Sequence, residues 1–355
     1  MEKILYIKHA NSSFVISDEK ILGKRYRVVP FLIDQKGSGF YFLGRMLSLC
    51  FFIVRNSRDA RLMVSWFGDY HSALMAFFGK ILGIKVIIFA GGQEAICYPE
   101  LKKGVYFKKI RGWFVKYALR NATAIIPNHK SLILHQNFYY SPDGKMDGIK
   151  HYIPGITTPI YIIPNGIDTG KYYRDTGIVK DPKHVLTVGT MSSTADFLNK
   201  GFDLFTEMAR RNPDLQFTLI GIKKQFMPWI EENYHILTVP NLELIFSFCP
   251  GEILFLNYNR AGVFVQASIT EGMPNTLGEA MLCECIPVGS NVNGIPDAIG
   301  NSGIIVMHRR VEELEQAVRQ AISLQTGAAA RQHVLDNYTF ALREARILRL
   351  MENIL

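Results

Sequence analysis

Residues 268–289 have the sequence Ser-Ile-Thr-Glu-Gly-Met-Pro-Asn-Thr-Leu-Gly-Glu-Ala-Met-Leu-Cys-Glu-Cys-Ile-Pro-Val-Gly, and this segment is the most informative about the fold class. The apolar run 262–268 that leads into it is typical of a buried parallel strand. A tight turn should follow at residues 271–274, because proline cannot continue a strand. Residues 275–284 then predict a helix, with Asn275 or Thr276 near its cap. Strand, turn and helix in this order indicate a parallel α/β sheet.

The turn also has the composition of a ligand site. Gly272 lets backbone amides approach a ligand, and the start of a helix favours anions. Glu271 lies before the helix and Glu279 about one turn inside it, so the two carboxylates can bind hydroxyl groups at two ends of one elongated ligand. A phosphate would lie on the amides between them. Hydroxyl groups at both ends and a phosphate between them are the arrangement of a nucleotide-sugar. The alternative is that Glu271 only caps the helix and Glu279 only faces solvent, which is common for two glutamates at this spacing without other signals.

Length and composition fit a globular protein of two domains, since the chain has 355 residues, 48% hydrophobic and 20% charged. Its five cysteines lack metal-binding spacing and predict reduced, structural thiols. The start of the chain predicts a strand, not a signal peptide. The apolar run 40–54 is interrupted by Arg45 and is too short to span a bilayer. We expect a cytoplasmic protein, peripheral on the inner face of the membrane.

Charge is distributed unevenly along the chain. Residues 1–165 hold 23 Lys and Arg against 10 Asp and Glu, while the remaining residues hold 17 against 21. An anionic partner is therefore expected for the first half only.

Strand and helix patterns alternate along both halves, which predicts two parallel sheets covered by helices. Residues 139–160 are rich in Gly, Pro, Asp and Lys and predict irregular structure. The predicted domains are an N-terminal domain over 1–166, a C-terminal domain over 167–335 and a last helix over 336–355.

The motif Glu-Gly-Met-Pro-Asn-Thr-Leu-Gly-Glu-Ala resembles the E-x7-E signature of retaining glycosyltransferases of family four. This resemblance implies the α/β GT-B fold, in which two doubly wound Rossmann-like domains face a central cleft and a last helix crosses back to the first domain. It implies that Glu271 meets the transferred sugar and that Glu279 meets the ribose. The segment 164–168, Pro-Asn-Gly-Ile-Asp, resembles the family's interdomain linker.

A second resemblance concerns Lys200-Gly201, which follows a strand and a glycine loop. In the family this lysine neutralises the donor diphosphate, and stabilising that leaving group is the main catalytic effect expected. The family often has arginine where this chain has Thr190, and Lys224 and Arg260 are alternatives for a second cation. The catalytic residues predicted are Lys200 and Glu271. The donor-binding residues predicted are Gly189, Thr190, Gly272, Met273, Pro274, Asn275, Thr276, Glu279 and, for the base, Phe248.

Acceptor contacts are expected from the first domain. The loop after strand 86–89 has Ala90 where many family members have a histidine that orients the sugar, and the alternative for this loop is a plain turn at a strand end. His71 is expected to be structural. No metal motif lies beside a strand end, so we expect no metal and no cofactor besides the donor substrate. The acceptor-binding residues predicted are Gly91, Gly92, Gln93, Glu94 and Ser12.

A basic stretch at 102–120 has seven Lys and Arg and no acid, interleaved with aromatic residues. This composition is typical of a helix on an anionic membrane surface, although the aromatics fit equally well in the core with the lysines solvated. The cations expected at the membrane are Lys102, Lys103, Lys108, Lys109, Arg111 and Lys116.

The sequence therefore predicts a retaining, metal-independent glycosyltransferase that moves a hexose-type sugar from a nucleoside diphosphate sugar to a glycan or lipid-linked acceptor. The alternatives are a basic nucleic-acid-binding protein and a non-catalytic nucleotide-sugar-binding protein. No known nucleic-acid-binding motif occurs, so we expect no nucleic acid partner. A long pyridoxal-dependent phosphorylase is disfavoured by the chain length.

Overall fold

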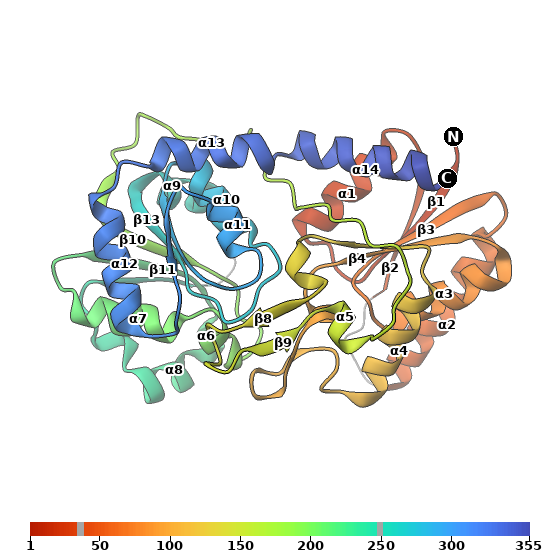
Figure 1. Ribbon diagram of the computed structural model, residues 1–355, viewed down its shortest axis with the longest axis horizontal. Helices are drawn as coiled ribbons and strands as arrows, with labels where there is room; N and C mark the ends of the chain where they lie inside the picture. Colours follow the sequence, from red (N-terminus) through yellow and green to blue (C-terminus); the bar gives the residue numbers. More distant parts are fainter. Residues whose placement is uncertain (34–38, 247–250) are drawn as a thin grey trace. The chain divides into compact units, whose positions relative to one another are not determined.

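A computed structural model of the chain describes residues 1–33, 39–246 and 251–355. It divides into two compact units, each with its own parallel sheet and covering helices (Figure 1). Unit 1 comprises Met1–His135, Asp147–Asn165 and Ala341–Leu355, and unit 2 comprises Gln136–Met146 and Gly166–Phe340.

The sheet of unit 1 has five parallel strands in the order β2-β1-β3-β4-β7. Its central strands are buried on both faces, which explains their continuous apolar sequences. Ile4 and Tyr6 pack in one cluster with α1 and α14, while Met63 points to the face that α3 covers. The strands are β1 (Lys3–Lys8), β2 (Arg27–Leu32), β3 (Ala60–Trp66), β4 (Lys85–Ala90) and β7 (Ala124–Pro127).

Local signals set the helix ends in unit 1. Helix α3 begins after Asp69, which forms a capping box with Ser72, and ends at Gly83 with a left-handed φ of 68°. The helices are α1 (Ser13–Gly23), α2 (Gly39–Asn56), α3 (Tyr70–Leu82), α4 (Lys109–Asn121), α5 (Ile149–Tyr152) and α14 (Phe340–Ile354). Short elements of unit 1 are η1 (Gln93–Ala95), β5 (Cys97–Tyr98), η2 (Pro99–Leu101), β6 (Lys103–Gly104) and η3 (Lys130–Leu132). The short strands β8 (His135–Asn137) and β9 (Lys145–Asp147) lie mostly in unit 2.

Two predictions about local structure were wrong in part. Residues 139–160 are not irregular throughout, because they contain β9 and α5; the Asp147 carboxylate accepts hydrogen bonds from the hydroxyls of Tyr98 and Tyr152 and organises this segment. The basic stretch 102–120 is helical only from Lys109 onward, since Lys102 has a φ of 52° after a short 3₁₀ turn and the next residue lies in β6.

The sheet of unit 2 has six parallel strands in the order β12-β11-β10-β13-β14-β15. The strands are β10 (Asp181–Val188), β11 (Gln216–Ile222), β12 (Leu242–Phe246), β13 (Ala261–Gln266), β14 (Ile286–Ser290) and β15 (Ile304–Val306). The helices are α6 (Ala195–Asn199), α7 (Phe202–Arg211), η4 (Lys224–Phe226), α8 (Met227–Tyr234), η5 (Ile236–Thr238), α9 (Gly251–Arg260), α10 (Asn275–Leu282), α11 (Ile295–Ile299), α12 (Val311–Ser323) and α13 (Gly327–Asn337).

The neighbouring strands β10 and β13 bring two loops together. Because the strands are parallel, their carboxyl ends meet at one edge of the sheet, where α/β proteins commonly bind ligands. The loop that leads to Lys200 and the loop that contains Glu271 therefore lie next to each other.

Candidate active site

An ion pair joins the two residues predicted to be catalytic. The Nζ atom of Lys200 contacts the Oε1 atom of Glu271, and the side chains keep 22% and 16% of their surface exposed. The hydroxyl of Ser268 donates to the same carboxylate oxygen at 3.1 Å. Partial burial strengthens the attraction between the two charges relative to open water. Both side chains remain exposed enough for a ligand to reach them.

The position of Lys200 depends on the glycine that follows it. Gly201 has a φ of 71°, and a Cβ atom there would lie 2.3 Å from the carbonyl oxygen of Ala267. The backbone N–H of Ile269 donates to the carbonyl of Asn199 at 2.8 Å. The turn at Lys200 is thus packed directly against the end of β13, which only glycine at 201 permits.

The loop with Glu271 is held by side chains from three other parts of unit 2. Asn137 donates from Nδ2 to the carbonyl of Ile269 at 2.8 Å, and Ser290 donates to the carbonyl of Ser268 at 2.7 Å. The backbone N–H of Glu271 donates to Asn293 Oδ1 at 3.1 Å. A loop with this many fixed backbone groups presents its carboxylate in one place before any ligand binds, which is a requirement for efficient positioning.

The glycine loop after β10 lies beside the lysine. A Cβ atom at Gly189 would come within 3.4 Å of the Lys200 side chain, and one at Gly221 would lie 1.9 Å from the Gly189 carbonyl. The Asp196 carboxylate accepts the backbone N–H groups of Ser192 and Ser193 at 2.7 and 2.9 Å. The predicted donor residue Thr190 is exposed.

Glu279 lies on α10 in a separate hydrogen-bonded group. The hydroxyl of Tyr258 donates to Glu279 Oε2 at 3.0 Å, and burial raises the pKa of this carboxyl. Tyr172 is a second hydroxyl partner of Glu279, and the charge of Lys171 favours the ionised form. A carboxylate that already accepts hydroxyl donors has the chemistry needed to bind a ribose.

The start of α10 differs slightly from the prediction. Pro274 occupies the cap position and no side chain caps the helix, so Asn275 and Thr276 are its first helical residues. The Thr276 hydroxyl donates to Gln266 Oε1 at 3.3 Å. Gly272, Met273 and Pro274 are buried in the turn, whose Gly272 carbonyl accepts the N–H of Gly294 at 3.0 Å. The residue predicted to contact the base, Phe248, lies outside the described residues.

The two alternatives for a second cation lie at opposite edges of the sheet. Lys224 follows the carboxyl end of β11, on the edge of the candidate site. Arg260 directly precedes the first residue of β13 and therefore lies at the amino edge. This topology rules out Arg260 as a partner of Lys200.

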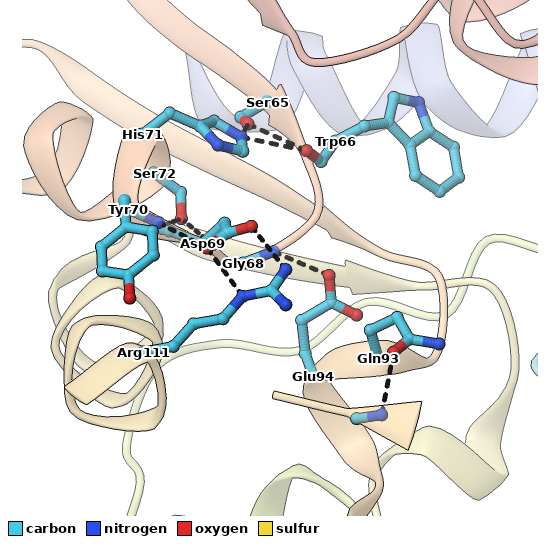
Figure 2. Close-up of polar contacts among 11 residues, drawn as sticks. Ser65, Trp66, Gly68, Asp69, Tyr70, His71, Ser72, Gln93, Glu94 and Arg111 are labelled. Carbon is cyan, nitrogen blue, oxygen red and sulfur yellow. Dashed lines mark hydrogen bonds and ion pairs between the residues drawn. The ribbon is translucent and has the colours of Figure 1, made fainter. Parts of the chain in front are cut away.

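Figure 2 shows that two of the predicted acceptor residues support the fold of unit 1. Gln93 accepts the N–H of Gly104 through Oε1 at 2.9 Å. Glu94 is fully buried and accepts the N–H groups of Gly68 and Gly92 at 2.7 and 3.2 Å. Burial raises the pKa of Glu94 to about 7. Both side chains therefore tie together the turns at the carboxyl edge of the sheet.

Other groups at this edge have different surroundings. Within the described residues, the buried Ser12 Oγ and His9 Nδ1 have no hydrogen-bond partner, so both can still receive one. A Cβ atom at Gly91 would lie 2.5 Å from the Phe67 ring. His71 is buried next to the Ser65 hydroxyl at 2.8 Å, and burial lowers its pKa to about 4, so it is neutral near pH 7.

Several residues that fix the site are far from it in the sequence and could not be predicted. Asn137, Ser290 and Asn293 fix the Glu271 loop, and Tyr258 with Tyr172 surrounds Glu279. Only Asn293 had a local signal, because Asn-Gly is a turn dipeptide and this asparagine has a φ of 48°.

The described residues contain neither a group of metal-ligating side chains nor a membrane-spanning helix. Over residues 1–33, 39–246 and 251–355, no group of three or more His, Cys, Asp or Glu side chains is placed to hold a metal ion. In the same ranges, no helix has both the length and the apolar character needed to cross a bilayer.

One segment of the chain matches a known family profile. Residues 182–323 match the profile of the family described as Glycosyl transferases group 1, and this segment contains both Lys200 and Glu271. The phosphatidylinositol N-acetylglucosaminyltransferase GPI3 subunit of Saccharomyces cerevisiae is 26% identical over 202 residues, which cover 51% of this chain and 40% of the yeast protein. The chain thus spans less than half the length of the curated relatives that it matches.

Solved structures define the fold. Sucrose-phosphate synthase from Thermosynechococcus elongatus has a TM-score of 0.76 at 13% identity, over 100% of this chain and 99% of the synthase. Anabaena Alr3699/HepE, solved in complex with UDP, has a TM-score of 0.74 at 13% identity, over 99% of this chain and 100% of the Anabaena chain. The chain has the GT-B fold, with two α/β units of Rossmann type, which confirms the predicted fold class.

Proposed function

We propose that the protein is a retaining glycosyltransferase that moves a hexose-type sugar from a nucleoside diphosphate sugar to an acceptor. The observation that supports this most directly is the pair of Lys200 and Glu271, held on two adjacent loops at the carboxyl edge of unit 2. The UDP bound to the similarly folded Anabaena protein supports a nucleotide-sugar as the donor.

In the proposed reaction the bond between the anomeric carbon and the β-phosphate oxygen breaks. The acceptor oxygen forms the new bond on the same face of the sugar, and the leaving phosphate takes the acceptor's proton. Lys200 stabilises the negative charge that grows on the diphosphate, Glu271 binds sugar hydroxyls, and Glu279 binds the ribose. Removing one such preorganised charge typically lowers the rate by about 10²–10³.

The acceptor is proposed to be lipid-linked. The name of the yeast relative specifies a phosphatidylinositol acceptor and an N-acetylglucosamine donor sugar. The basic stretch 102–120 of unit 1 fits a substrate in an anionic membrane. We further propose that transfer needs no metal, so that a chelator leaves the rate unchanged, and that the product keeps the anomeric configuration of the donor, which proton NMR of the product measures.

Substitution of the paired residues tests the proposal. Lys200→Ala and Glu271→Ala should each lower kcat by about 100-fold or more, while the melting temperature stays near wild type, since neither side chain is part of the core. Lys183→Ala is the matched control, because this exposed lysine lies at the opposite end of β10. Wild-type rates in either test variant would refute the assignment.

A non-catalytic nucleotide-sugar-binding protein is the second candidate. It would show a donor-dependent rise in melting temperature, because a ligand that binds the folded state stabilises it by mass action. No sugar would be transferred in that case, so measuring both stabilisation and turnover with a panel of nucleotide-sugars separates the two functions.

A further inference from the structure

Helix α2 of unit 1 exposes an apolar stripe. Leu43, Leu47, Phe51 and Val54 are 55%, 62%, 66% and 55% exposed, and their spacing of four, four and three residues places them on one side of the helix. The opposite side buries Met46, Leu49 and Ile53. Single exposed apolar residues are ordinary, but a continuous stripe of large ones on a stable helix marks an interaction surface.

Two neighbouring helices carry further exposed apolar side chains. Tyr70, at the start of α3, contacts Phe42 of α2 and Phe114 of α4, with ring centroids 5.2 and 5.1 Å apart. Figure 1 shows α2, α3 and α4 close together on the same part of unit 1. We call their exposed side the outer face. Its further large apolar side chains are Phe77 (47%) and Ile81 (62%) of α3 and Ile110 (72%) and Trp113 (62%) of α4.

The charge of the outer face has one sign. Helices α2, α3 and α4 contain no Asp or Glu. Asp69, just before α3, is 4% exposed and is neutralised by Arg111 at 2.6 Å. Exposed cations of these helices and their ends are Arg55, Lys80, Lys108, Lys109 and Arg120.

Apolar side chains bordered by cations, without acidic groups, match the surface of an anionic bilayer better than they match a protein surface of mixed charge. The apolar groups enter the boundary between head groups and acyl chains, and each cation near the lipid adds about 1 kcal/mol. Trp113 is of the residue type enriched at membrane–water interfaces.

We propose that the outer face of α2, α3 and α4 docks unit 1 on an anionic lipid bilayer, with Leu47 and Phe51 among the inserted side chains. This goes beyond the proposed sugar transfer and does not depend on it. The basic stretch 102–120 then supplies only part of the contact, and α2 supplies the inserted apolar surface.

Co-sedimentation with vesicles tests the proposal. Wild-type protein should pellet with vesicles of phosphatidylcholine and phosphatidylglycerol, less with phosphatidylcholine alone, and less in high salt. The double variant Leu47→Gln/Phe51→Gln should bind anionic vesicles about tenfold or more weakly, since each buried apolar side chain contributes to insertion. Leu237→Gln is the matched control, because Leu237 is 64% exposed in unit 2; it should bind like wild type.

A spectroscopic measurement locates the contact. Trp66 is 1% exposed and Trp229 is partly buried, so Trp113 should account for a blue shift of emission on anionic vesicles and for quenching by brominated lipids. Trp113→Phe should abolish both. Donor-dependent stabilisation should be the same in all these variants, because none lies in the nucleotide-sugar site, and this separates a failure of docking from a failure of the proposed function.

Several outcomes would overturn the proposal. These are wild-type protein that ignores anionic vesicles, a double variant that binds them as well as wild type, and a control that weakens as much as the double variant. A wild-type dimer that dissociates in the double variant, without lipid binding by either protein, would assign the outer face to a second copy of the chain instead.

Discussion

Glu94 is a buried residue of unit 1 whose ionisation is coupled to folding. Its carboxyl group is fully buried, and burial raises its pKa from the ordinary value of 4.5 to about 7. The folded protein therefore holds a proton that the unfolded chain releases between these two pH values.

The stability of unit 1 should respond to pH through this group. Glu94 contributes stability that is fully present below about pH 4.5 and is lost as pH rises to about 7, by roughly 3 kcal/mol in total. His71 acts in the opposite direction, since its lowered pKa of about 4 costs stability as pH falls below 6.5. Glu94→Gln should remove only the first effect. Urea unfolding at about pH 5 and about pH 8 measures this effect. If the free energies of unfolding of wild type and variant differed by the same amount at both pH values, the prediction would be contradicted.

Single site residues could be predicted from the sequence only where their role depends on neighbouring residues in the chain. Lys200 and Glu271 each lie in a short motif that follows a strand, so both could be singled out from local residues. Asn137 could not, because it lies 132 residues from Ile269, whose carbonyl it binds. Gln93 and Glu94 were selected from the correct loop, but their partners in β6 and after β3 depend on tertiary structure.

At the scale of elements, the alternation of strands and helices was predicted well. Parallel strands buried on both faces are continuous apolar runs, so β11, β13 and the second half of β10 stand out in the sequence. By contrast, β9 is short and polar, and it is organised by the side chain of Asp147, which no local pattern reveals.

The junction between α6 and α7 gives a prediction at this scale. Gly201→Ala should lower stability by more than about 1–2 kcal/mol, because a left-handed alanine is strained and its Cβ would also clash with Ala267. Transfer activity should fall as well, since the turn positions Lys200. Gly83→Ala is the control: it has a φ of 68°, and a Cβ there would meet nothing within 4 Å.

Melting temperatures and transfer rates of both glycine variants check this prediction. The Gly83 variant should lose only the stability that corresponds to backbone strain at a left-handed alanine. It should keep wild-type activity, because Gly83 lies at the end of α3 in unit 1. Equal losses in the two variants would argue that the contact with Ala267 does not constrain the turn.

For the molecule as a whole, a buried ion pair fixes α14 to α1 within unit 1. Arg343 and Asp18 are 2% and 0% exposed and lie 2.6 Å apart. Arg343 also donates to the carbonyls of Ile163 and Pro164, and Trp66 donates to Asp18 at 2.9 Å. These contacts connect segments from the beginning, middle and end of the chain.

Breaking this pair should destabilise unit 1 strongly. Arg343→Met leaves a buried carboxylate without its partner and should cost about 3–5 kcal/mol in urea unfolding, part of which Asp18→Asn should restore in the double variant. Lys24→Ala is the control, because Lys24, which directly follows α1, pairs with Glu344 of α14 but is 58% exposed, so it should cost about 0–1 kcal/mol. Similar losses in both variants would refute the special role of the buried pair.

The interleaving of the two units has a consequence for biosynthesis. Unit 2 takes residues 136–146 from the first half of the chain, including the asparagine that holds the Glu271 loop, and unit 1 takes residues 341–355. During translation, neither unit can be complete when the ribosome passes residue 166. Unit 1 must wait for α14, so unit 2 has all its residues first although it begins later. If the chain were cut once near residue 166, the C-terminal fragment would lack Asn137. Its donor site should therefore be less well fixed than in the intact chain.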